Sequence, residues 1–186
     1  SLKANTTADY NTAIGQSALL VNTTGHSNTA VGYAALDANT TANQNTAVGY
    51  QAMTANTTGH SNVAVGALAL DANTTAASNT AIGHNSLGEN TTGTRNTAIG
   101  ANAADACTDG ANDNIAIGYD ALGANTGGDY NVIIGNYAHS ASDGAGYNVA
   151  VGYQALNANT TSDNLAIGYQ ALLACTTGNN NIAIGN

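Results

Sequence analysis

Apolar and polar positions alternate within a short motif that recurs along the whole chain. The first copy, Asn-Thr-Ala-Ile-Gly at 11–15, is followed by ten close copies at steps of 17 residues, with one step of 18 and one of 16. The copies begin at Asn11, Asn28, Asn45, Asn62, Asn79, Asn96, Asn114, Asn131, Asn148, Asn164 and Asn181. A fixed period of this length is typical of a solenoid, in which each repeat forms one coil against its neighbours.

Each repeat predicts two short extended segments and two turns. After the motif come two variable residues, an Ala-Leu pair, and then Asn-Thr-Thr-Gly or a close variant. Glycine adopts positive φ without steric cost and Asn tolerates it, so turns are expected at these residues. No repeat leaves room for a helix of ordinary length. We therefore predict an all-β fold, a parallel β-solenoid of about ten 17-residue coils that forms one domain over residues 1–186.

The strand of each motif has two constrained faces. Side chains alternate along a strand, so Thr and Ile/Val face one way, whereas Asn, Ala and Gly face the other. The Ala place holds Ala in every copy except one, where Ile133 stands. The Ile/Val place is β-branched throughout and comprises Ile14, Val31, Val48, Val65, Ile82, Ile99, Ile117, Ile134, Val151, Ile167 and Ile184.

A narrow coil has only one interior, which leaves two interpretations of these faces. In the first, Ala lines the interior and the Ile/Val row is covered by another copy of the chain, because large exposed apolar patches mark interaction surfaces. In the second, the Ile/Val row fills the interior and Ala faces outward. The Leu row would share that interior and begins with Leu19, Leu36, Met53, Leu70 and Leu87.

The repeat also resembles known fibre repeats. Asn-Thr-Ala-Ile-Gly-x-x-Ala-Leu is similar to the Ser-Val-Ala-Ile-Gly-x-x-Ala repeats of trimeric autotransporter adhesin heads. It is closer to the Asn-Thr-Ala-Val-Gly-Tyr-Gln-Ala-Leu repeats of phage tail-fibre proteins, and the resemblance covers residues 1–186. The coil of this chain is longer than that of the adhesin head, and the extra residues fall near Asn-Thr-Thr-Gly.

This resemblance implies a left-handed parallel β-roll, a homotrimer with three chains side by side and the Ile/Val row towards the trimer axis. It implies a structural fibre or adhesin segment, extracellular on a virion or cell surface, that presents or forms a host- or surface-binding element. The implied partners are other copies of the chain and a cell-surface or glycan receptor. Since the sequence starts and stops within a repeat, we expect a segment of a longer fibre or a unit that stacks end to end.

Composition narrows the possible partners. Charged residues make up 7% of the chain, far below the usual quarter, and the net charge is −9. Lys3 and Arg95 are the only fixed cations in the sequence, so it lacks the basic footprint of nucleic-acid binding. No apolar run approaches the roughly 20 residues of a membrane span. We expect neither nucleic-acid binding nor membrane insertion.

Two rows of Asn carry the clearest polar signal. The Asn that opens each motif is expected to stack on its equivalents and to form a hydrogen-bonded ladder along the solenoid. The second row, in the Asn-Thr-Thr segments, is replaced by Cys107 and Cys175. Because Cys behaves as a small buried residue, this row is expected to point inward. Four coils of about 4.8 Å separate the two cysteines, which excludes an internal disulfide.

Three carboxylates are candidates for a calcium site, namely Asp105, Asp109 and Asp113. They surround the 18-residue step, where a loop with Gly and several oxygens would suit a hard cation. The spacing matches neither the EF-hand loop nor the Gly-rich calcium repeat, and a solvated acidic edge is the alternative. No other metal and no cofactor is expected.

Binding of ice or glycans is the alternative function. Paired Thr residues recur in the Asn-Thr-Thr segments, as an ice-binding grid would require, but they are adjacent and lie in a turn. Spaced Tyr rings could stack on sugars or could form a cross-coil stack; they are Tyr33, Tyr50, Tyr119, Tyr153 and Tyr169. No nucleophile, base and orienting group share one register, so no enzymatic activity is predicted.

Overall fold

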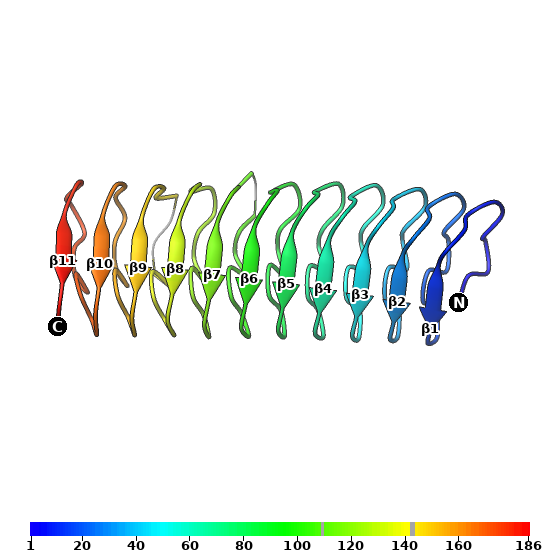
Figure 1. The fold of residues 1–186 in the computed structure, drawn as a ribbon, viewed down its shortest axis with the longest axis horizontal. Coiled ribbons are helices and arrows are strands. Elements are labelled where there is room, and N and C mark those ends of the chain that lie inside the picture. The colour runs from blue at the N-terminus through cyan, green and yellow to red at the C-terminus, as the bar shows by residue number, and fades with distance from the viewer. Residues whose placement is uncertain (109, 142–143) are drawn as a thin grey trace.

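The chain forms one row of stacked coils with a single flat sheet along one side (Figure 1). The computed structural model describes residues 1–108, 110–141 and 144–186. The strands are β1 (Thr12–Ile14), β2 (Thr29–Val31), β3 (Thr46–Val48), β4 (Val63–Val65), β5 (Thr80–Ile82), β6 (Thr97–Ile99), β7 (Ile115–Ile117), β8 (Val132–Ile134), β9 (Val149–Val151), β10 (Leu165–Ile167) and β11 (Ile182–Ile184). They form an 11-stranded parallel sheet in chain order, which confirms the predicted parallel β-solenoid.

Neighbouring strands pair in strict motif register. The Ala of each motif lies opposite the Ala of the next, as in the pair Ala13 and Ala30. The register is unchanged across the 18-residue step, where Ala98 pairs with Ala116, and across the 16-residue step, where Ala150 pairs with Ala166. The extra and missing residues are therefore accommodated outside the strands. A slip by one residue would turn every side chain to the other face, so the sheet holds its register and the connecting segments absorb the difference.

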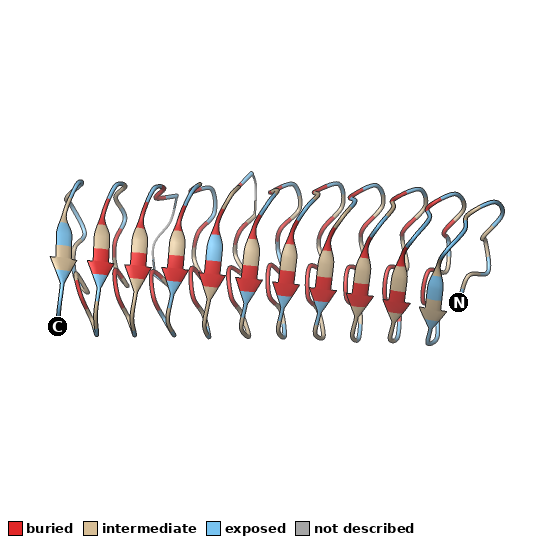
Figure 2. Cartoon of the chain, viewed as in Figure 1, coloured by how far each residue is buried: buried red, intermediate tan, exposed pale blue. Residues whose placement is uncertain are grey.

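The burial of side chains shows which face of each strand points into the coil. The strand Ala is buried in β2 to β10, except in β8, where Ile133 takes its place and is buried as well (Figure 2). The Ala-Leu pair closes the coil from the opposite wall, and its largest buried members are Leu19, Leu36, Met53, Leu70, Leu87, Leu122 and Leu156. The interpretation that placed the Ile/Val row inside is therefore wrong. Where a Leu side chain fills the space between the two walls, a small residue such as Ala fits on the strand side, whereas β8 carries Ile133 in a coil whose Leu place holds His139.

The corners of the coil combine glycine with unusual left-handed backbone at other residues. Gly66 follows β4 with a φ of 141°, and a Cβ there would clash with the carbonyl oxygen of Gly83 in the next coil. Only glycine allows coils to approach this closely. Leu36, Met53 and Leu70 also have positive φ, near 51°, although they carry buried side chains. Burial of the Leu side chain offsets the strain of about 1 kcal/mol that such a backbone costs.

No helix occurs in the three described ranges, and so none there could span a membrane.

Candidate interaction face and interior ladders

The outer face of the sheet carries two columns of side chains that project away from the coil. One column is the Ile/Val row, and its mid-solenoid members Val65, Ile82 and Ile99 are 36%, 38% and 37% exposed. Each of them is flanked by equivalent residues one coil above and below, yet more than a third of its surface stays in contact with solvent. Ten coil spacings of about 4.8 Å make this face about 48 Å long. The structure therefore presents a long, regular apolar strip.

The second column lies two residues earlier in each strand and changes along the solenoid. Thr occupies it in β1, β2, β3, β5 and β6, with Val63 in β4. From β7 onward the column is entirely apolar, and it comprises Ile115, Val132, Val149, Leu165 and Ile182. The apolar strip is thus wider over β7 to β11 than over the first six strands.

Tyrosine rings stack along one edge of this face, directly after the strands. Tyr33 and Tyr50 are stacked with ring centroids 5.4 Å apart, and Tyr153 and Tyr169 are stacked at 5.5 Å. Tyr137 joins the second group through an edge-to-face contact of 6.1 Å with Tyr153. Since neighbouring rings cover one another's faces, the column offers ring edges rather than the open faces on which sugars stack.

The opposite edge, directly before the strands, carries a second and shorter aromatic stack. Tyr130 and Tyr147 lie here with centroids 5.1 Å apart. Arg95 and Asp113 occupy the same position in earlier coils and form a two-pronged ion pair, with Nε–Oδ1 and Nη2–Oδ2 distances of 2.6 and 2.7 Å. The guanidinium of Arg95 lowers the pKa of the Asp113 carboxyl.

The two calcium candidates that the structure describes, Asp105 and Asp113, have different partners. Asp113 is engaged by Arg95, whereas Asp105 lies near Asp120 and Glu89. Partial burial, followed by repulsion from Asp120, raises the pKa of Asp105. Asp109 lies outside the described residues. Within the described ranges, no three His, Cys, Asp or Glu side chains are placed to hold a metal ion.

The first Asn row forms a continuous ladder inside the solenoid. The backbone N–H of Asn28 donates to Oδ1 of Asn11 at 2.9 Å, and Nδ2 of Asn28 donates to the carbonyl of Ala42 at 2.8 Å. Asn45 repeats the first contact by donating its N–H to Asn28 at 3.0 Å. The same backbone-to-amide bond runs to Asn181, through Asn62, Asn79, Asn96, Asn114, Asn131, Asn148 and Asn164. Each amide therefore links neighbouring coils, and these buried groups are used structurally rather than for a ligand.

The second Asn row forms a side-chain ladder in the first coils, which ends at Asn73, and Cys107 replaces Asn further along the row. Nδ2 of Asn39 donates to Oδ1 of Asn22 at 2.8 Å, and the pattern continues towards Asn73. Beyond Asn73 the ladder stops: the buried Oδ1 atoms of Asn73 and Asn90 both have no hydrogen-bond partner among the described residues, and Cys107 supplies no amide donor to Asn90. On the other side, Nδ2 of Asn125 lies 3.7 Å from the Cys107 sulfur. Burial raises the pKa of the Cys107 thiol to about 12, so it is not a reactive nucleophile.

His139 is a second irregularity in the interior, and the sequence pattern did not single it out. It occupies a Leu place and is fully buried. Its Nε2 lies 3.4 Å from Nδ2 of Asn148 and 3.5 Å from Nδ2 of Asn159, so the neutral ring accepts from two amides. Nδ1 has no partner within the described part of the chain. Desolvation lowers the pKa of His139 to about 4.

The paired Thr residues of the turn segments do not form an ice-like grid. Oγ1 of Thr23 donates to the carbonyl of Thr40 at 3.0 Å, and Thr57 donates to Thr74 in the same way. The first hydroxyl of each pair is thereby used between coils. The second Thr, such as Thr24, is exposed and forms one isolated column.

Comparison with known proteins identifies no related family or structure. The chain matches no family model. No curated protein and no solved structure is significantly similar to it either. The likeness to adhesin and tail-fibre repeats therefore rests on the motif itself.

Proposed function

We propose that this chain is a rigid structural segment of an extracellular fibre or adhesin, and that it works as a homotrimer whose sheets face a common axis. The observation that carries the proposal is the exposed Ile/Val column on a flat sheet whose inner face is already filled by Ala. The number of chains and a left-handed coil are supported by the resemblance of the motif. The role on a virion or cell surface, and a receptor or glycan as final partner, have the same support.

The size of the face is consistent with association. It presents eleven side chains of the Ile/Val column and six further apolar side chains of the second column. Covering the exposed part of each would contribute roughly 1 kcal/mol, or roughly 17 kcal/mol in total. The loss of translational and rotational freedom costs about 4–15 kcal/mol. Association is thus favourable only when the coils act together, which favours a long partner with the same spacing, namely another copy.

The mass of the purified chain in solution tests this proposal. Sedimentation equilibrium should return three times the chain mass of 18.3 kDa. A single chain mass at every concentration would refute it.

A triple substitution tests which face is used. Replacing Val65, Ile82 and Ile99 by Asp places three charges in the apolar column and should yield monomers. The matched control adds the same charge elsewhere by replacing the exposed turn residues Thr24, Thr41 and Thr58, and should leave the mass unchanged. If the first variant remains assembled, the interface lies on another face.

A second candidate is ice binding by the first half of the sheet. Thr29, Thr46, Thr80 and Thr97 place hydroxyls on the outer face of the sheet beside the Ile/Val column, with Val63 between them in β4. Thermal hysteresis near freezing tests this function, and a solution without hysteresis removes it. Assembly through the same face would cover these hydroxyls, so mass and hysteresis measured on one sample distinguish the two functions.

A further inference from the structure

The two halves of the sheet face are not equivalent as contact surfaces. In the first six coils, the hydroxyls of Thr29, Thr46, Thr80 and Thr97 form no hydrogen bonds with the described residues. Covering them without a partner group would cost free energy. Over β7 to β11 the same column carries only Ile, Val and Leu, whose burial is favourable without any such condition.

Aromatic side chains border both edges of the sheet in neighbouring coils of the second half. Tyr153 and Tyr169 follow β9 and β10, and Tyr147 precedes β9. In the first half, the coils after β2 and β3 carry Tyr33 and Tyr50 on the following edge, but the preceding edge carries Tyr10 before β1 and only polar side chains before β2 to β6. Tyr is enriched at the centres of protein interfaces because it combines a large apolar body with a polar tip.

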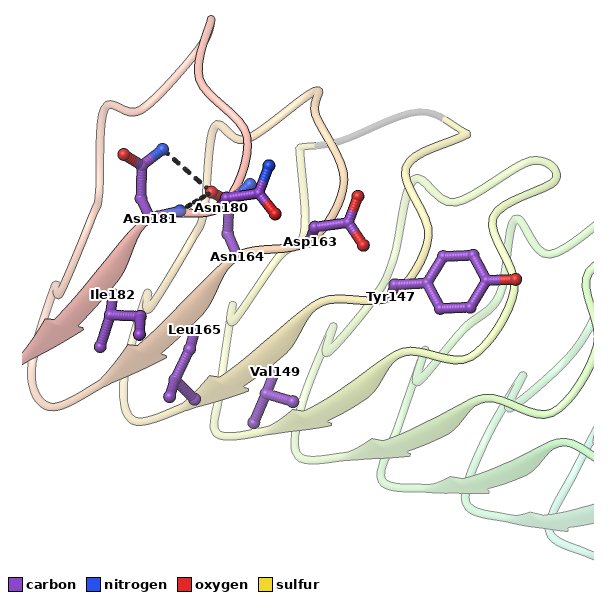
Figure 3. A pocket seen from close by; sticks show the side chains of 8 residues that line it. All are labelled: Tyr147, Val149, Asp163, Asn164, Leu165, Asn180, Asn181 and Ile182. Carbon is purple, nitrogen blue, oxygen red and sulfur yellow. Dashed lines mark hydrogen bonds between the residues drawn. The ribbon is translucent and has the colours of Figure 1, made fainter.

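A groove runs along the preceding edge at β9 to β11 (Figure 3). Its apolar side is formed by Val149, Leu165 and Ile182, and its polar side by Tyr147, Asp163 and Asn180. The polar and the apolar residue of each strand segment are two positions apart, so both side chains point to the outer face of the sheet. The groove therefore opens on the face proposed above as the contact between copies. An apolar floor beside a carboxylate acceptor is suited to an aromatic ring that carries a hydroxyl.

Symmetry indicates which side chain enters this groove. When identical chains surround an axis parallel to their length, the edge after the strands of one copy meets the edge before the strands of the next. Tyr153 and Tyr169 follow β9 and β10, and they therefore lie at the same level as the groove of the neighbouring copy. Asp163, in the groove, would accept a hydrogen bond from a Tyr hydroxyl.

We propose that copies of this chain are held together mainly through their C-terminal halves, with Tyr153 and Tyr169 of one copy seated in the β9–β11 groove of the next. The inference rests on the proposed self-association and identifies where its binding energy lies. The Thr-lined half closes against its neighbours but contributes less to the affinity.

The chain contains its own matched control for this proposal. Tyr33 and Tyr50 occupy the same repeat position as Tyr153 and Tyr169, with nearly the same stacking distance and a similar exposure. In the full chain, Y153A/Y169A should raise the concentration of half-dissociation about tenfold or more, because buried Tyr anchors dominate interfaces. Y33A/Y50A should raise it less than about threefold. Circular dichroism that is equal in the two variants shows that both remain folded.

The outcomes separate this inference from the function on which it rests. A wild-type chain that stays monomeric at every concentration removes the proposed function. If the wild-type chain assembles, but Y33A/Y50A loses as much affinity as Y153A/Y169A or more, only the assignment to the C-terminal half is overturned. A further test uses near-isosteric exchanges: V132T/V149T should weaken assembly, and a variant with unchanged affinity contradicts the role of the apolar column.

Discussion

Replacing Cys107 by Asn should stabilise the chain by supplying the amide donor that the buried Oδ1 of Asn90 lacks. In the unbroken part, each Nδ2 donates to Oδ1 of the preceding coil at distances such as 2.8 Å between Asn39 and Asn22. An Asn at 107 would supply the missing donor to Asn90 and accept from Asn125, whose Nδ2 lies only 3.7 Å from the sulfur. A buried acceptor without a partner costs about 1–3 kcal/mol. Because Cys and Asn side chains are close in volume, the exchange adds little strain.

We expect a gain of about 1–2 kcal/mol, which raises the melting temperature of a chain of this size by about 2–8 °C. Thermal unfolding at a fixed chain concentration measures the shift, since assembly also affects the midpoint. Hydrogen exchange should show the added protection mainly in the coils that contain Asn90 and Asn125, as stability in solenoids is local.

Two control variants separate the supply of this donor from simple loss of the thiol. Cys107→Ala removes the sulfur without providing an amide and should not stabilise. Asn56→Cys creates the same defect in an intact stretch and should destabilise by an amount similar to the gain. The reasoning is refuted if Cys107→Asn melts at or below the wild-type temperature, or if Cys107→Ala gains as much.

Three further perturbations test the interior and the corners. As pH falls from 6.5 towards about 4, the unfolded chain binds a proton that folded His139 does not, so the free energy of unfolding should fall by about 3 kcal/mol. In H139L this loss should be absent, whereas H26L should retain it; equal slopes in urea titrations of the two variants would contradict the burial. A thiol reagent should label the half-buried Cys175 but not Cys107 in the native protein, and rapid labelling of both thiols would show an open interior. Gly66→Ala should lower stability by about 3 kcal/mol or more in thermal unfolding, because its Cβ would meet the backbone of the next coil, and a neutral effect would refute that packing.

The period of the sequence was sufficient to predict the coil, the parallel sheet and the register. It was not sufficient to decide the facing of the strand, because Ala30 and Val31 are both apolar. Hydrophobicity alone would favour the larger Val31 inside. The decision comes from the opposite wall, where Leu36 fills most of the interior and the small Ala30 packs opposite it. This distance across the coil cannot be read from one strand.

The left-handed backbone at the Leu row was also beyond prediction from residue types. Leu36 has a φ of 51°, a conformation that sequence reasoning assigns to Gly or Asn. Its N–H donates to the carbonyl of Ala52 in the next coil at 3.1 Å, and its carbonyl accepts from the N–H of Asn39 at 3.2 Å. The conformation is imposed by these contacts and by burial of the side chain, which depend on neighbouring coils rather than on local preference.

The distribution of polar and apolar groups within one repeat accounts for coil stacking and supports the proposed assembly. The interior contains Asn amides that only an equivalent amide or carbonyl one coil away can satisfy, and the outer face contains apolar columns that only a surface of the same spacing can cover along their length. The irregular coils lie close together. Cys107, the 18-residue step and His139 fall around β6 to β8, where the outer column also changes from Thr to Ile and Val. Because the stability of a solenoid is a sum over neighbouring coils, we expect the contacts between coils to be weakest in this stretch. The change of the outer face therefore begins where the interior is irregular, and the half proposed above as the main contact between copies starts at this stretch.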